Sequence, residues 1–190
     1  MKKILILITL IGFVSCNSFK VDPITAYIID EGQHNSYSYN FNNKRKKNPI
    51  APILIRGNRL EFNFMFTSQH IYNYNIKDGD DINKLYGITS TKIHQNSARF
   101  GWRYIGNNKF EIFAYYYVKG IRDWYSLLIV KINETVKYSI DVSNKQYTFG
   151  ANNNWHHVYN TKNIMAFRSY PWFGGNNTAP HKMIFKIIEL

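Results

Sequence analysis

Polar and apolar residues alternate with a period of two along much of this 190-residue chain. The alternation is clearest over residues 37–41, 60–66, 71–76 and 135–142, where aromatic and β-branched side chains recur at every second position. Successive side chains of a β-strand point to opposite faces of its sheet, so this pattern is typical of strands with one buried face. Asn, Gly and Asp residues typical of turns separate these segments. We therefore predict an all-β fold, a single two-sheet antiparallel sandwich of the jelly-roll or concanavalin A-like type.

The N-terminus has the composition of an export signal. Lys2 and Lys3 precede an apolar run over residues 4–14, which is shorter than the roughly 20 residues of a membrane-spanning helix. Ser15 then precedes Cys16, the only cysteine of the chain. The arrangement resembles a bacterial lipoprotein signal, in which cleavage leaves the cysteine as a lipid-modified N-terminus. An uncleaved anchor or an ordinary secretory signal remains the alternative.

This interpretation divides the chain into three parts. We expect residues 1–15 to be the signal peptide, residues 16–25 the lipidated N-terminus with a short tether, and residues 26–190 the β-sandwich domain. The lipid on Cys16 would hold the domain at the cell envelope, on the outer membrane or the cell surface.

The chain is strongly basic, with 24 Lys and Arg against 12 Asp and Glu and a formal charge of +12. Removing Lys2 and Lys3 with the signal leaves +10 for the mature part (12 − 2). A charge of this sign favours anionic partners such as acidic polysaccharide or lipid headgroups. Export argues against nucleic acid, so we predict a membrane contact through the lipid and an anionic glycan as partner. The sequence leaves the oligomeric state open.

Two neighbouring strand-like segments carry the best candidate for a ligand site. Alternation places Arg99 and Arg103 on one face of the first segment, and Phe113, Tyr115 and Tyr117 on one face of the second. If the two strands pair, these side chains meet. Flat rings stack on sugar faces, and guanidinium groups bind hydroxyls or carboxylates, so the set favours an acidic carbohydrate. The alternative is that the aromatic residues form a second buried layer.

The same face permits an enzymatic interpretation. Polysaccharide lyases on jelly-roll scaffolds combine Arg, Gln or Asn, His and Tyr, and the set His94, Arg99, Arg103, Tyr115 and Tyr117 resembles that combination. The diagnostic motifs of the lyase families are absent, and a glycosidase would need a second placed carboxylate. We therefore favour binding over catalysis and name no catalytic residue. A lyase, or a structural or adhesin-like surface protein without a small ligand, is the alternative.

A glycine- and proline-rich segment precedes the last predicted strand. It reads Tyr-Pro-Trp-Phe-Gly-Gly over residues 170–175 and Ala-Pro-His over residues 179–181. Together with residues 83–87 and 97–103, the segment resembles a family of exported bacterial lipoproteins of unassigned function, over residues 81–190. The resemblance implies a β-sandwich and an exported location, but no catalytic residue.

The prolines stiffen this loop, and its glycines allow a close backbone approach. The loop either shapes a crossover between the sheets or holds Trp172 and His181 at the rim of a ligand site, and we include both residues among the ligand candidates.

Three carboxylates, Asp78, Asp80 and Asp81, lie within four positions. Calcium takes several oxygen ligands from compact loops, so this spacing is a weak calcium candidate. It lacks the full EF-hand pattern, and an Asp-Gly turn with solvated acids accounts for it better. We therefore predict no metal and no cofactor.

Overall fold

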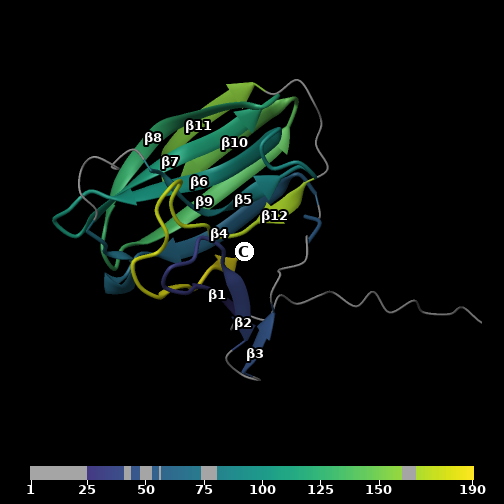
Figure 1. Cartoon of the computed structure of the whole chain (residues 1–190). Coiled ribbons are helices and arrows are strands. Elements are labelled where there is room, and N and C mark those ends of the chain that lie inside the picture. Colours follow the sequence, from purple (N-terminus) through teal and green to yellow (C-terminus); the bar gives the residue numbers. More distant parts are fainter. Residues whose placement is uncertain (1–24, 41–43, 48–52, 56, 74–80, 160–165) are drawn as a thin grey trace, which may run out of the picture.

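The computed structural model (Figure 1) describes residues 25–40, 44–47, 53–55, 57–73, 81–159 and 166–190. These residues form three antiparallel sheets. The first sheet has the strand order β12-β5-β6-β7-β8. Its strands are β5 (Asn83–Thr89), β6 (Asn96–Tyr104), β7 (Lys109–Val118), β8 (Ile121–Lys131) and β12 (Phe167–Ser169).

The second sheet has the order β11-β10-β9-β4-β14 and packs against the first. Its strands are β4 (Arg59–Met65), β9 (Thr135–Ser143), β10 (Gln146–Ala151), β11 (Asn154–Tyr159) and β14 (Ile188–Glu189). The inward positions of both sheets are the alternating apolar residues of the sequence. Phe62 on β4 stacks on Tyr138 of β9 at 5.0 Å between ring centres and meets the ring of Phe100 on β6 at 5.9 Å. This core confirms the predicted all-β sandwich.

A third, smaller sheet lies beside this sandwich, below it in the view of Figure 1. Its order is β13-β1-β2-β3, with β1 (Thr25–Ile29), β2 (Tyr37–Asn40), β3 (Arg45–Lys47) and β13 (Met183–Phe185). The pairing of β1 with β13 joins the two ends of the described chain, with Tyr27 opposite Phe185. Such a long-range pairing leaves no local signal in the sequence, so this sheet could not be predicted from periodicity.

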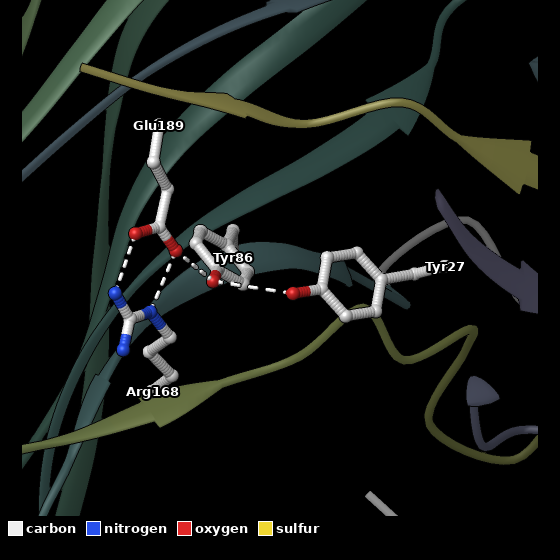
Figure 2. Close-up of polar contacts among 4 residues, drawn as sticks. All are labelled: Tyr27, Tyr86, Arg168 and Glu189. Atoms are coloured by element: carbon white, nitrogen blue, oxygen red, sulfur yellow. Dashed lines mark hydrogen bonds and ion pairs between the residues drawn. The ribbon is translucent and has the colours of Figure 1, made fainter. Parts of the chain in front are cut away.

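Hydrogen bonds and one ion pair connect residues of the three sheets (Figure 2). Arg168 on β12 donates two hydrogen bonds to the Glu189 carboxylate on β14, at 2.6 and 2.5 Å. The hydroxyl of Tyr86 on β5 donates to the same carboxylate at 2.5 Å and lies 3.4 Å from the hydroxyl of Tyr27 on β1. The network therefore fixes the third sheet relative to the edge of the sandwich.

One short 3₁₀ helix, η1 (Ser68–His70), places a histidine in the core. The His70 ring is 1% exposed and packs edge-on against the rings of Phe64 and Phe66. The backbone N–H of Thr67 donates to its Nδ1 at 3.0 Å. Burial lowers the pKa of His70 to about 4, so the ring is neutral at physiological pH. Among the described residues, no helix has the length and apolar composition to cross a membrane.

Candidate functional site

The outer face of the first sheet brings together the residues that alternation had grouped. β6 and β7 pair with Arg99 opposite Tyr115, Gly101 opposite Phe113, and Ser97 opposite Tyr117. The two strands therefore pair, and these side chains lie together on the face away from the core.

Phe113, Tyr115 and Tyr117 form a floor of aromatic rings on this face, and most of its surface is buried. Phe113 is 3% exposed and Tyr115 4%, and together with Ile82 they make a separate buried cluster. Tyr117 is half-buried and packs against that cluster. Phe113 and Tyr115 therefore support charged side chains rather than presenting open ring faces for stacking.

Arg99 is a buried cation on this floor. It is 5% exposed, and its guanidinium carbon lies 5.1 Å from the ring centre of Tyr115 and 5.9 Å from that of Tyr117. Its Nε has no hydrogen-bond partner, and no carboxylate of the described residues forms an ion pair with it. Burial lowers the pKa of Arg99, because it removes the charge from water.

Arg103 has the opposite environment. Its Nε and Nη2 donate to Glu111 Oε2 at 2.8 and 2.7 Å, and Ser126 donates to Glu111 Oε1 at 2.7 Å. The guanidinium also lies 5.2 Å from the ring centre of Phe113. Its charge is therefore neutralised within the sheet, whereas no described carboxylate neutralises the charge of Arg99.

Lys84 on β5 also belongs to this face, although it was not among the residues predicted from the sequence. It lies opposite Gly101, and its Nζ is 4.9 Å from the ring centre of Tyr115. Burial, and next to it the charge of Arg99, lower the pKa of Lys84 to about 8. A bulge in β5 between Lys84 and Gly87 breaks the period of two, so alternation would have grouped the lysine with the buried Tyr86.

A cleft of about 1010 Å³ opens beside this face, between the third sheet and the β12 edge of the first. Arg99 forms part of its wall, together with hydroxyl and amide side chains that include those of Asn35, Ser36, Thr89 and Ser169. The Ser36 hydroxyl is buried and, like the Arg99 Nε, has no hydrogen-bond partner among the described residues.

Trp172 stands at the wall of this cleft. Its backbone exchanges two hydrogen bonds with Lys84, at 2.8 and 2.9 Å, and forms a bridge to Asn35 on the other side. Its half-buried indole stacks on His34 at 5.3 Å between ring centres. The proline-rich loop therefore brings Trp172 to the same cleft as Arg99.

The two remaining histidine candidates lie elsewhere. His181 donates from Nε2 to the carbonyl of Gln69 at 2.9 Å, beside η1, and does not line the cleft. His94 is exposed and meets the Tyr117 ring edge-on at 5.2 Å. The structure thus joins His94 to the outer face but separates His181 from it.

Asp81 anchors a loop. Its Oδ2 accepts hydrogen bonds from the backbone N–H groups of Asn176 and Asn177, at 2.9 and 3.4 Å. These bonds lower the pKa of Asp81 despite its partial burial. Asp78, Asp80 and Cys16 lie outside the described residues. Within the described ranges, no group of three His, Cys, Asp or Glu residues is placed to hold a metal ion.

No protein-family model matches the chain, and no curated protein matches it. Solved structures do resemble it. The alginate lyase from Klebsiella pneumoniae is 12% identical with a TM-score of 0.55, and the match covers 70% of this chain and 59% of the lyase. The alginate lyase from Alteromonas sp. 272 is 9% identical with a TM-score of 0.47, covering 85% of this chain and 72% of that one. The β-glucanase from Bacillus licheniformis is 10% identical with a TM-score of 0.43, covering 91% and 94%.

At these identities the likeness concerns the fold, and the chain spans only 59% of the length of the Klebsiella lyase. Together with its own sheet order and core, this likeness shows that the chain has the jelly-roll, concanavalin-like β-sandwich fold.

Proposed function

We propose that this protein binds an acidic carbohydrate in the cleft beside the first sheet, with Arg99 as the cation that meets the acidic group of the ligand. The observation that carries the proposal is the buried guanidinium of Arg99, which pairs with no carboxylate of the described residues and forms part of the cleft wall. Burying an unpaired charge costs several kcal/mol in a protein. A carboxylate or sulfate of the ligand would offset that cost.

The walls of the cleft suit a sugar. Their hydroxyl and amide groups can exchange hydrogen bonds with sugar hydroxyls, and the half-buried ring of Trp172 offers a flat apolar surface. The volume of about 1010 Å³ lies at the upper end of the range for small-molecule sites, which is large enough for an oligosaccharide segment.

The chemistry of the face supports binding better than cleavage. A lyase needs a base that is deprotonated near neutral pH, but burial raises the pKa of Tyr115 to about 12. Tyr115 is also covered, which leaves Tyr117 and His94 as the accessible aromatic groups of the predicted lyase set. Cleavage of uronate polymers is therefore the second candidate, tested in the same experiment.

The location belongs to the proposal as well. Lipid modification of Cys16 would hold the domain on the outer membrane or cell surface, where polymeric glycans are accessible. Metabolic labelling with a clickable palmitate analogue tests this. We expect label in the parent and none in Cys16→Ser, which should also lose its membrane association. A labelled Cys16→Ser variant would contradict the anchor.

The ligand proposal is tested by calorimetric titration of the full-length protein in detergent with alginate, polygalacturonate and neutral lichenan. We expect binding to the acidic polymers only, and its loss in Arg99→Gln. Lys92→Gln, which removes an exposed charge on the loop between β5 and β6, should bind like the parent. A folded Arg99→Gln variant with the parent's affinity would refute the role of Arg99. Unsaturated products would establish a lyase, and no binding at all would favour a structural or adhesin-like protein.

A further inference from the structure

Two cations share the ring of Tyr115. The Lys84 Nζ lies 4.9 Å from its centre and the Arg99 guanidinium carbon 5.1 Å. The two residues come from neighbouring strands of the first sheet, and the bulge in β5 turns Lys84 toward this face. Two positive side chains held beside one buried ring repel each other unless an anion lies between them.

The other buried or half-buried arginines of the described residues have a carboxylate. Arg103 is paired with Glu111 at 2.7 Å and Arg168 with Glu189 at 2.5 Å. No ion pair of this kind joins Lys84 or Arg99 to a described carboxylate.

Asp81 is the acidic residue that acts on Lys84, but its carboxylate already accepts other hydrogen bonds. Its Oδ2 accepts the backbone N–H groups of Asn176 and Asn177. Among the described residues, the Lys84 ammonium donates to the carbonyl of Gly174 at 3.4 Å. An ammonium has three donors, so this single long bond leaves donor capacity for a ligand.

We propose that Lys84 and Arg99 together form a binding site for one oxyanion group, the carboxylate or sulfate of the glycan, beside the ring of Tyr115. The inference rests on the proposed function and adds a specificity-determining residue to it. Arg99 would contact the group from the wall of the cleft, and Lys84, which is half-buried and does not itself line the cleft, would contact it from the neighbouring strand β5. The planar guanidinium supplies directional donors, whereas the ammonium acts as a point charge.

The test compares Lys84→Met with Lys92→Met, a matched loss of one exposed charge. Both full-length variants and the parent are titrated with oligogalacturonate, with its neutral methyl ester and with a sulfated κ-carrageenan oligosaccharide. For Lys84→Met we expect an affinity for the charged ligands that is about tenfold lower or more, with the methyl ester within about twofold of the parent. Lys92→Met should match the parent for all three. Comparing the carboxylated with the sulfated ligand tells which oxyanion the site prefers.

An equal loss for charged and neutral ligands would overturn the inference while leaving the proposed function intact, since Lys84 would then act through the structure alone. A second measurement does not need a glycan. In the parent with ¹³Cε-labelled lysine, added inorganic sulfate should shift the Lys84 resonance, and the shift should disappear in Arg99→Gln but persist in Lys92→Met. If the parent shows no shift and no glycan affinity depends on Lys84, the two-cation site is refuted, whatever the titrations say about carbohydrate binding as such.

Discussion

The guanidinium carbon of Arg99 lies 5.1 Å from the ring centre of Tyr115 on the neighbouring strand, and the arginine is 5% exposed. A cation–π contact of this kind recovers only part of the hydration that a buried guanidinium loses. The buried charge of Arg99 therefore lowers the free energy of unfolding, and no carboxylate of the described residues offsets this loss.

Replacing this charge by an apolar side chain should separate stability from binding. We expect Arg99→Met to raise the free energy of unfolding by about 1 kcal/mol, because the unpaired buried charge is gone, and to abolish binding of acidic glycans. Arg103→Met should have the opposite effect and lower stability by about 1 kcal/mol, because it leaves the half-buried Glu111 without its partner. Urea unfolding of both variants measures this, and a destabilised Arg99→Met would assign Arg99 a packing role instead.

The pKa of Lys84, lowered to about 8, predicts how binding depends on pH. An anion beside the lysine favours the charged amine, so affinity should be constant below pH 7 and fall as pH rises through 8, by up to tenfold per unit. The charges that act on Lys84 are those of Arg99, Asp81 and Arg122. The pKa of Asp81 is lowered and that of Tyr115 is about 12, so neither group titrates in this window.

Calorimetry between pH 6 and 10 measures this dependence. Lys84→Arg should keep the affinity of the parent at pH 7 and lose the decline above pH 8, because a guanidinium remains charged. A parent whose affinity does not change up to pH 10 would contradict a contact between Lys84 and the anion.

His70 predicts an acid dependence of stability. Its folded pKa of about 4 lies below the usual value of 6.5, because the ring is buried among aromatic side chains. Between pH 6.5 and pH 4, His70 therefore takes up a proton in the unfolded chain but not in the native protein. Stability from this residue is complete above pH 6.5 and declines as pH falls toward 4, by roughly 3 kcal/mol in total.

Urea unfolding at pH 7 and pH 5 measures the effect of His70. His70→Phe should flatten the slope between these values, although it loses the bond from Thr67. His157→Phe, at an exposed histidine of β11, should keep the parent's slope. The same slope in the parent and in His70→Phe would mean that other groups cause the dependence.

The residues of the outer face could be predicted from the sequence because they lie on two strands that follow each other in the chain. Arg99, Gly101 and Arg103 alternate on one strand and Phe113, Tyr115 and Tyr117 on the next, and a short connection places the strands side by side. The period of two then assigns the faces without knowledge of the rest of the chain.

What could not be predicted depends on irregular or distant pairing. The bulge in β5 reverses the faces after Lys84, which hid that residue from any argument based on alternation. The cleft requires the third sheet, whose strand β1 pairs with β13 near the other end of the chain. Burial of Phe113 and Tyr115 depends on Ile82, which packs on them from outside both strands.

Gly101 tests how tightly this floor is packed. A Cβ built on it would lie 2.4 Å from Ile82 Cγ2 and 3.3 Å from the Phe113 Cβ. Gly101→Ala should therefore destabilise the protein by about 1–3 kcal/mol through overpacking, since the β-branched isoleucine has few alternative rotamers. Ile82→Ala removes the clashing methyl, so the double variant should be less destabilised than the sum of the single variants, as a double-mutant cycle would show. Additive effects would mean that the strain lies elsewhere.

Glu189 predicts how the third sheet is held. Its carboxylate accepts two hydrogen bonds from Arg168 and one from Tyr86, and Tyr86 leads on to Tyr27 of the third sheet. Arg168 and Glu189 are each only 15% exposed in their side chains, so Glu189→Gln leaves a largely buried guanidinium without its anion. We expect a loss of about 2 kcal/mol in the free energy of unfolding, together with faster hydrogen exchange in β1.

The matched control is Glu61→Gln on β4, where the carboxylate pairs with Arg59 and Lys137, both more than half exposed. Solvent screens that pair of contacts, so its loss should cost about 0.5 kcal/mol or less and leave exchange in β1 unchanged. Since β2 and the β1–β2 connection form one wall of the cleft, Glu189→Gln should also weaken glycan binding, whereas Glu61→Gln should not. Equal effects of the two substitutions on stability and exchange would show that the network does not position the third sheet.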